Sequence, residues 1–178
     1  MPSFKTKHLT LKLMLSITPI LSEWSLASET LNHCSPGEKI YFSCQTKNGK
    51  IISLCGESAD ASNTSLSYAF GRKQKVELIY PSPTTNGSVA NFKYNNYFRY
   101  GVDYYRVSFI NGKYKYSIYR DIDEEATPSF QAGVIVEDIR KKNSKEFKIA
   151  CETNITENLK ELSKILACDH ESALGCAH

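Results

Sequence analysis

The chain has 178 residues, of which 41% are hydrophobic, 11% aromatic and 23% charged. This length supports one compact domain and is too short for two full ones. The 11 Tyr and 8 Phe exclude an intrinsically disordered chain. No apolar run reaches the ~18 residues that a membrane-spanning helix needs, so an integral membrane protein is not expected.

The first 27 residues have the layout of a secretory signal peptide. Three lysines within residues 1–12 form a basic start, residues 13–21 (LMLSITPIL) form a short apolar segment, and residues 25–27 (SLA) place small side chains before a cleavage site. We expect cleavage after Ala27 and a mature domain of residues 28–178 in the periplasm or outside the cell. The alternative is a short buried helix that begins the domain.

Cleavage would leave a nearly neutral domain. It removes three of the 22 basic residues and one of the 19 acidic residues, Glu23, which changes the formal net charge from +3 to +1. A surface with so little excess positive charge binds polyanions poorly. Nucleic acid is therefore not expected as a partner.

All six cysteines follow the expected cleavage site, and an even number of cysteines in an exported chain predicts three disulfides. Cys168 and Cys176 are close in sequence, which favours a local bridge. The other two bridges would then use Cys34, Cys44, Cys55 and Cys151. Cys44 and Cys55 flank an expected hairpin and would lie diagonally across it, near the distance limit for a disulfide. We therefore expect one of them to pair with Cys151.

Alternating apolar and polar residues recur between residues 39 and 151 and predict short antiparallel strands. The expected strands are residues 39–44, 51–55, 65–70 and 76–80, a hairpin over 104–119, and residues 132–137 and 146–151.

Two Asn-Gly pairs predict the hairpin turns. A two-residue turn at Asn48-Gly49 would place Cys44 opposite Ser53 and Cys55 opposite Phe42. A turn at Asn111-Gly112 would give these opposing pairs: Phe109 with Tyr114, Val107 with Tyr116, Tyr105 with Ile118, and Ser108 with Lys115.

The end of the chain predicts one helix. Asn154 followed by Glu157 resembles a capping box, and Leu159, Leu162 and Leu166 recur at helical spacing over residues 155–167. The fold class expected is mainly β: an antiparallel barrel or strongly bent sheet of seven to nine strands, with one C-terminal α-helix, stapled by disulfides.

No catalytic constellation is visible in the mature chain. Its three histidines lie near its ends, away from the strands where a serine or cysteine nucleophile would need a base. Glu77 paired with Asp103 or Asp121 has no spacing that singles it out for glycoside cleavage. We therefore expect a protein that is not an enzyme and that needs no cofactor.

A metal site is not expected either. Cys168 and Cys176, with His170 and His178, offer two thiolates and two imidazoles, but their spacing does not match zinc sites and export favours oxidation. Residues 121–125 (DIDEE) offer alternating carboxylates for calcium but lack the glycine and distal glutamate of the helical calcium loop. We expect this segment to be a solvated loop between strands.

The densest group of aromatic residues lies between Tyr94 and Tyr105, with Arg99 and Arg106 beside it. Exposed tyrosines suit protein interfaces or sugar stacking, and core packing or cross-strand pairing within a sheet is the ordinary alternative. The acidic segment 121–125 suits a basic cleft on a partner protein. The residues predicted to bind a partner are Tyr97, Phe98, Tyr100, Tyr104, Asp121, Asp123, Glu124 and Glu125.

Several motifs in order resemble a family of small, mostly uncharacterised exported proteins of Gram-negative bacteria. The motifs are E-K-x-x-F-S-C at residues 38–44, K-x-x-S-x-C at 50–55, L-x-Y-x-F-G at 66–71, E-x-x-Y-P at 77–81 and F-x-x-G-x-Y-x-Y-x-x-Y at 109–119, followed by the strand that ends at Cys151. The acidic loop, the expected helix and the last two cysteines depart from this pattern. The resemblance implies a periplasmic or secreted location and transfers no catalytic residue.

These observations favour a periplasmic, non-enzymatic binding protein. The first hypothesis is an immunity or inhibitor protein that neutralises a cell-envelope-targeting toxin or hydrolase by inserting a loop into its cleft. A rigid, disulfide-held sheet suits this role because it holds the loop in one conformation before binding. The alternative is a glycan- or envelope-binding module that uses exposed tyrosines. The direction in which the tyrosines point separates the two hypotheses.

Overall fold

The computed structural model describes residues 31–57, 65–82, 88–141 and 145–177. The expected signal peptide lies outside them. The described residues form one ten-stranded sheet in the order β10-β5-β6-β7-β8-β9-β1-β2-β3-β4. All neighbouring strands are antiparallel except β10 and β5. The strands are β1 (Lys39–Thr46), β2 (Ile51–Gly56), β3 (Leu66–Arg72), β4 (Lys75–Tyr80), β5 (Phe92–Arg99), β6 (Val102–Asn111), β7 (Tyr114–Asp123), β8 (Phe130–Asp138), β9 (Phe147–Glu157) and β10 (Ala167–Cys168).

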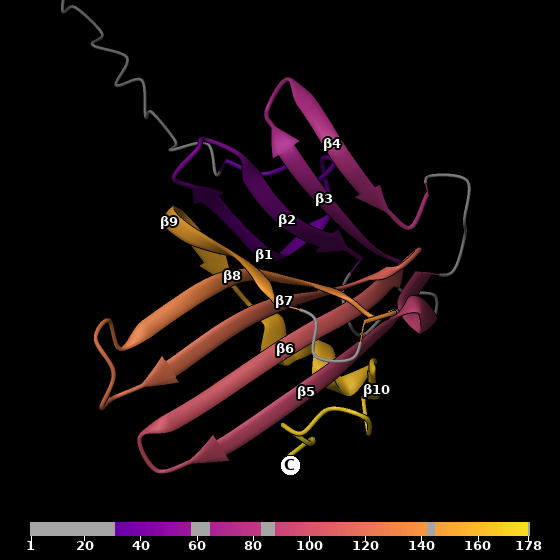
Figure 1. The fold of residues 1–178 in the computed structure, drawn as a ribbon. Coiled ribbons are helices and arrows are strands. Elements are labelled where there is room, and N and C mark those ends of the chain that lie inside the picture. The colour runs from indigo at the N-terminus through magenta and orange to yellow at the C-terminus, as the bar shows by residue number, and fades with distance from the viewer. Residues whose placement is uncertain (1–30, 58–64, 83–87, 142–144, 178) are drawn as a thin grey trace, which may run out of the picture.

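The sheet curls because β9 belongs to both of its halves. Residues 147–150 pair with β8, whereas residues 151–157 pair with β1 through two register shifts. Asn154 lies within this second stretch and has a φ of +53°, a left-handed conformation that Asn tolerates better than most residues. Such irregularities bend a strand. Strands β1–β4 consequently fold over β5–β8, giving the half-barrel seen in Figure 1.

Aromatic side chains fill the space between the two halves. Phe109 of β6 stacks on Tyr80 of β4 with 4.3 Å between ring centroids, and on Tyr116 of β7 at 5.0 Å. Tyr68 of β3 and Phe92 of β5 contact the same Phe109 ring at 5.0 and 5.4 Å. Aromatic residues of this size dominate the energetics of a small core. The bent-sheet alternative of the expected fold class is therefore the one observed.

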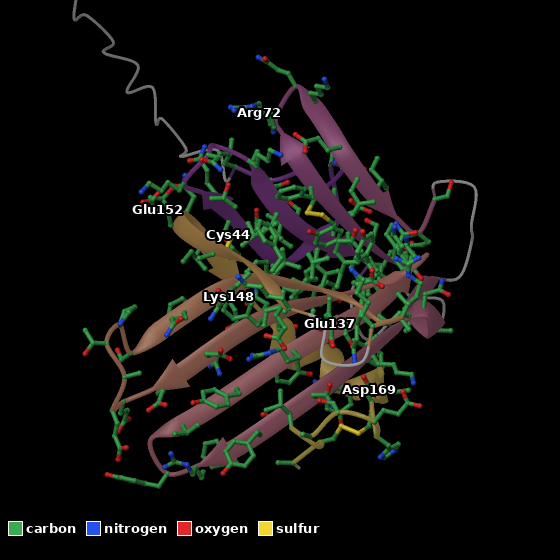
Figure 2. All side chains as sticks on the ribbon, viewed as in Figure 1. Cys44, Arg72, Glu137, Lys148, Glu152 and Asp169 are labelled. Carbon is green, nitrogen blue, oxygen red and sulfur yellow. A yellow bond between two sulfur atoms is a disulfide. The ribbon has the colours of Figure 1, made fainter. Side chains whose placement is uncertain are left out.

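Three disulfides cross-link the described residues. Cys168 pairs with Cys176, as the sequence favours, and Cys44 pairs with Cys151, so that the long-range bridge also forms. Cys34 pairs with Cys55. Cys44 is fully buried and lies beside β9 at the junction of the two sheet halves (Figure 2). This bridge fastens the corner at which the sheet bends.

The expected registers of both hairpins are wrong. In the β1–β2 hairpin, Thr46 and Lys50 close a three-residue loop in which Gly49 has a φ of +71°, so Cys44 lies opposite Ile52 and Ser43 opposite Ser53. A type I turn with a glycine bulge accounts for the extra residue.

In the β6–β7 hairpin the turn is Gly112-Lys113, one residue later than expected, with Gly112 at a φ of +60°. The opposing pairs are therefore Phe109 with Tyr116, Val107 with Ile118, Tyr105 with Arg120, and Ser108 with Ser117. Because partners shift by two positions, each side chain stays on the face that the sequence predicts.

The expected C-terminal helix over 155–167 is wrong. Strand β9 runs to Glu157, and only a 3₁₀ helix, η2 (Leu159–Lys164), follows it before β10. The predicted capping box depends on Asn154 and Glu157, but both lie within β9, and Glu157 pairs with Phe42 of β1. Leu159 and Leu162 are fully buried, and their three-residue spacing fits the 3₁₀ repeat of three residues per turn.

The strand count of seven to nine is also too low. Strand β5 and the short β10 are the two additions, and a second short 3₁₀ helix, η1 (Ser88–Asn91), leads into β5. Strand β10 and the residues after it lie along the outer edge of β5 (Figure 1). The tail therefore covers that edge as far as Asn96.

Gly133 of β8 occupies a position that excludes any side chain. Its φ is +154°, and a Cβ atom there would lie 2.1 Å from the Ile149 carbonyl oxygen and 2.9 Å from the Tyr119 ring. We expect Gly133→Ala to lower the free energy of unfolding by ~2–4 kcal/mol, since overpacking and backbone strain add. Denaturant unfolding tests this. Gly112→Ala is the control, because that glycine also has positive φ but no atom within 4 Å of the added Cβ, and an equal loss in both variants would contradict the steric argument.

Candidate functional site

Two turns at one end of the sheet form a projecting surface, here called the finger (residues 97–104 and 121–130). It contains the β5–β6 turn and the β7–β8 loop, which extend away from β1–β4 at the lower left of Figure 1. The two turns are joined, because the Glu124 amide donates a hydrogen bond of 2.9 Å to the Gly101 carbonyl oxygen. Gly101 has a φ of +71°, which allows the tight β5–β6 turn.

Aromatic side chains occupy both faces and the tip of the finger. Tyr97 and Tyr104 are opposite each other on β5 and β6, with ring centroids 6.1 Å apart and planes tilted by 33°. Phe98 follows Tyr97 in the strand and therefore points to the other face, where it is 64% exposed. Tyr100 lies in the turn and is 93% exposed. The aromatic surface is thus convex rather than a flat row.

Two of the four acidic residues hold the finger together. Asp121 forms a bidentate ion pair with Arg106, in which Nη1 contacts Oδ1 and Nη2 lies 3.0 Å from Oδ2. Asp123 accepts a hydrogen bond of 2.8 Å from the Tyr104 hydroxyl. That bond lowers the pKa of Asp123, helped by the Glu125 amide, and raises the pKa of Tyr104. These contacts fix the β7 end against β6.

The other two acidic residues face solvent. Glu124 and Glu125 are exposed, and within the described part of the chain neither carboxylate forms an ion pair. Arg99 lies close by, and its guanidinium contacts the Tyr100 carbonyl oxygen at 3.4 Å. With Asp121 neutralised by Arg106, the finger carries more negative than positive charge. Glu124 and Glu125 are the carboxylates available to a partner.

All eight residues predicted to bind a partner lie in the finger, but they divide into two groups. Phe98, Tyr100, Glu124 and Glu125 are exposed, whereas Tyr104, Asp121 and Asp123 are partly covered and bonded to neighbours. Tyr97 is 39% exposed and packs on Tyr104. Sequence reasoning missed Phe130, which is 39% exposed at the start of β8 and pairs with Ile122. Only the alternation of apolar and polar residues in β8 could have indicated this position.

Of the carboxylates considered for glycoside cleavage, one lies on β4 and the other two lie on opposite faces of the neighbouring strands β6 and β7. Glu77 of β4 pairs with Lys50 at 2.6 Å, and Asp121 pairs with Arg106 in the finger. Asp103 points to the inner face of the sheet and contacts Arg120 at 2.6 Å and Lys160 at 2.5 Å. Each carboxylate has a cationic partner of its own, so the structure brings no two of them together as an acid–base pair.

The cysteines of the zinc alternative, Cys168 and Cys176, are bridged to each other. One further group of potential ligands, Cys34, Glu38 and Cys55, lies close together, but Cys34 and Cys55 also form a disulfide. A disulfide sulfur is not the thiolate that binds zinc. Neither group of cysteines therefore offers a set of thiolate ligands.

Comparisons with known proteins assign the chain to no family. No family model matches the chain, and no curated protein and no solved structure matches it significantly. Among the described residues, no helix has the length and apolar character required to span a membrane.

Proposed function

We propose that the chain is an exported, non-enzymatic binding protein whose finger enters the cleft of a toxin or hydrolase that attacks the cell envelope, and neutralises it. The observation that carries the proposal is the distribution of aromatic residues over both faces and the tip of one projecting hairpin. Phe98 and Tyr100 are 64% and 93% exposed there. Large aromatic side chains that fill pockets supply most of the affinity in protein interfaces.

The position of the tyrosines supports a protein partner over a sugar. A sugar ring stacks on a flat exposed platform, whereas Phe98 and Tyr97 point to opposite faces. The exposed carboxylates of Glu124 and Glu125 lie beside them and suit a basic cleft. The ion pair between Asp121 and Arg106 stabilises the free finger, so little conformational entropy is lost on binding.

The three disulfides support an oxidising compartment such as the periplasm or the cell exterior. A small binding protein that works there gains from covalent cross-links, because it must keep its shape without a large core. The location therefore fits the role proposed for the finger.

Affinity capture from periplasmic extract tests the proposal. We expect the mature protein to retain a toxin or hydrolase, and Phe98→Ser and Tyr100→Ser each to weaken binding by ~30-fold or more, the effect of a central interface residue. Phe147→Ser is the matched control, because Phe147 is 66% exposed but lies on β9 outside the finger. The captured enzyme should lose activity in proportion to occupancy.

A second set of variants separates charge from apolar contact. Charge reversal at Glu124 and Glu125 should slow association in a salt-dependent way, whereas Glu152→Lys on β9 should not. Saturable binding to peptidoglycan without any protein partner would favour the alternative, a glycan-binding module centred on the Tyr97–Tyr104 pair. Equal binding by the finger variants and the Phe147 control would remove the finger from the interface.

A further inference from the structure

A pocket of about 280 Å³ lies at the opposite end of the β5–β6 hairpin from the finger. Lys93 at the start of β5 lines it, and the four residue steps from Lys93 to Tyr97, where the finger begins, correspond to roughly 13 Å of extended strand. The residues that line the pocket come from β4, η1, β5, β6, β7, the position directly after β8 and the C-terminal tail. None of them belongs to the finger.

One side of the pocket is apolar. Ile110 and Ile139 line it and are 53% and 47% exposed. Tyr80, Ala90 and Phe109 also line the pocket, but the Phe109 ring points to the core face of β6, opposite to Ile110, and stacks on Tyr80. Isoleucine side chains this exposed on neighbouring segments form a surface that water solvates poorly. The backbone holds Ile139 beside the β6–β7 turn, because its amide donates a hydrogen bond of 3.1 Å to the Lys113 carbonyl oxygen. An apolar group placed here would cover both isoleucines.

The other side of the pocket contains a buried ion pair. Asp169 of the tail is only 3% exposed and lies 2.7 Å from the Lys115 ammonium; Figure 2 labels it on the tail beside β5. Burial alone would raise the pKa of Asp169, but the hydrogen bond and charge of Lys115, together with the Glu171 amide and Lys93, lower it. Asp169 and Lys115 therefore neutralise each other's charge and form part of the pocket wall.

Two charged groups of the pocket remain available. The Lys93 side chain is half exposed and forms a long ion pair with Asp169 at 3.9 Å; because this distance is beyond hydrogen-bond range, the Lys93 ammonium can still donate hydrogen bonds to a ligand. Glu171 is exposed, and among the described residues its carboxylate forms no ion pair. The pocket thus presents one ammonium, one carboxylate and an apolar wall. A ligand that matches it carries one carboxylate, one ammonium and an apolar group.

We propose that this pocket binds a free α-amino acid with an apolar side chain. The ligand carboxylate would pair with Lys93, its ammonium with Glu171, and its side chain would cover Ile110 and Ile139. An α-amino acid carries both charges on one carbon, which suits a pocket at the small end of the range for ligand sites. This site is independent of the finger and of the function proposed for it.

Calorimetric titration of the full mature chain with L-phenylalanine tests the proposal. We expect saturable binding, and at least about tenfold weaker binding of 2-phenylethylamine, which lacks the carboxylate, and of 3-phenylpropionate, which lacks the ammonium, because each loses one charged hydrogen-bonding group. Lys93→Gln and Glu171→Gln should each weaken binding of L-phenylalanine to a similar extent. Lys113→Gln is the control, since Lys113 lies in the β6–β7 turn and does not line the pocket.

The variants also assign each ligand group to its partner. Lys93→Gln should bind L-phenylalanine and 2-phenylethylamine equally, because the carboxylate no longer has a partner, whereas Glu171→Gln should bind L-phenylalanine and 3-phenylpropionate equally. Binding of L-phenylalanine that neither substitution changes would overturn the proposal, and so would no saturable binding at millimolar concentration. Neither result would bear on the finger.

Discussion

Removing the Cys44–Cys151 bridge by a double substitution to alanine is expected to lower the free energy of unfolding by about 5 kcal/mol. The bridge closes a loop of 107 residues, and the entropy that a cross-link removes from the unfolded chain grows with loop length. The loss should be large in this fold, because Cys44 is fully buried and the bridge fastens the corner where β9 passes from β8 to β1.

The Cys168–Cys176 bridge provides the comparison. It spans only 8 residues, so the same double substitution there should lower the free energy of unfolding by about 2.5 kcal/mol. Equilibrium unfolding in guanidinium chloride, in buffer without reductant, measures both values. A greater loss from the C-terminal bridge than from the long one would show that the corner does not limit stability.

Arg120→Met is expected to lower the free energy of unfolding by about 3–5 kcal/mol, the range for removing one partner of a buried ion pair. Arg120 is 9% exposed on the inner face of β7. It contacts Asp103 at 2.6 Å and lies 3.3 Å from Glu157, while Lys160 of η2 also reaches Asp103. Methionine keeps most of the apolar stem but leaves Glu157 without a cation in this network and Asp103 with Lys160 alone.

Arg140→Met is the matched control for this prediction. The Arg140 side chain is 58% exposed and pairs with Asp138 at 2.8 Å, and surface ion pairs of this kind contribute only ~0–1 kcal/mol. The same losses in both variants would mean that the inner network contributes no more than a surface pair.

The dependence of stability on pH gives a second readout of the Arg120 network. Burial alone would raise the pKa of Asp103, but hydrogen bonds from Arg120 and Lys160 outweigh it and lower the pKa below the ordinary value of 3.8. A lowered native pKa stabilises the fold above the unfolded-state pKa and loses that contribution as the pH falls through the native value. Wild type should therefore lose stability below about pH 4, and Arg120→Met should lose less over the same range.

Local patterns in the sequence predicted most strands, the number of disulfides and the pairing of Cys168 with Cys176, but left open whether Cys44 or Cys55 pairs with Cys151. Residues 51–55 and 132–137 alternate or are uniformly apolar and have turn residues on both sides, so their strands followed from periodicity alone. The spacing of the cysteines sufficed for the bridge between Cys168 and Cys176. Both predictions depend on residues that are close in the chain.

Strand β5 was missed although its main partner, β6, follows it directly in the chain, because polar residues that bond to a remote segment break its pattern. Asn95 and Asn96 interrupt its apolar pattern, and the Asn95 side chain is buried only because its Nδ2 donates to the carbonyl oxygens of Asp169 and Gly175 at 2.8 and 3.1 Å. The tail that accepts these bonds is more than 70 residues away. Polar residues satisfied by a remote segment resemble a loop when only local sequence is considered.

The finger likewise combines features that local sequence predicts with features that depend on the fold. Dense aromatic residues and an acidic segment identified the right stretches of chain, and the sequence alone could not show that Asp121 and Asp123 are held by Arg106 and Tyr104. That distinction depends on the register of β6 with β7, which sets Tyr104 opposite Asp121. The sequence predicted all four acidic residues as partner contacts, and only the structure separates the exposed Glu124 and Glu125 from the bonded Asp121 and Asp123.

Photo-crosslinking in the native compartment tests the role of the finger most directly. A benzophenone-bearing phenylalanine analogue replaces Tyr100 at the tip in one protein and Phe147 on β9 in another, since both side chains are exposed. A protein adduct from position 100 that is absent from position 147 is the result we predict. Adducts from position 147 alone, or attachment of position 100 only to glycan, would contradict the proposal that the finger binds a protein.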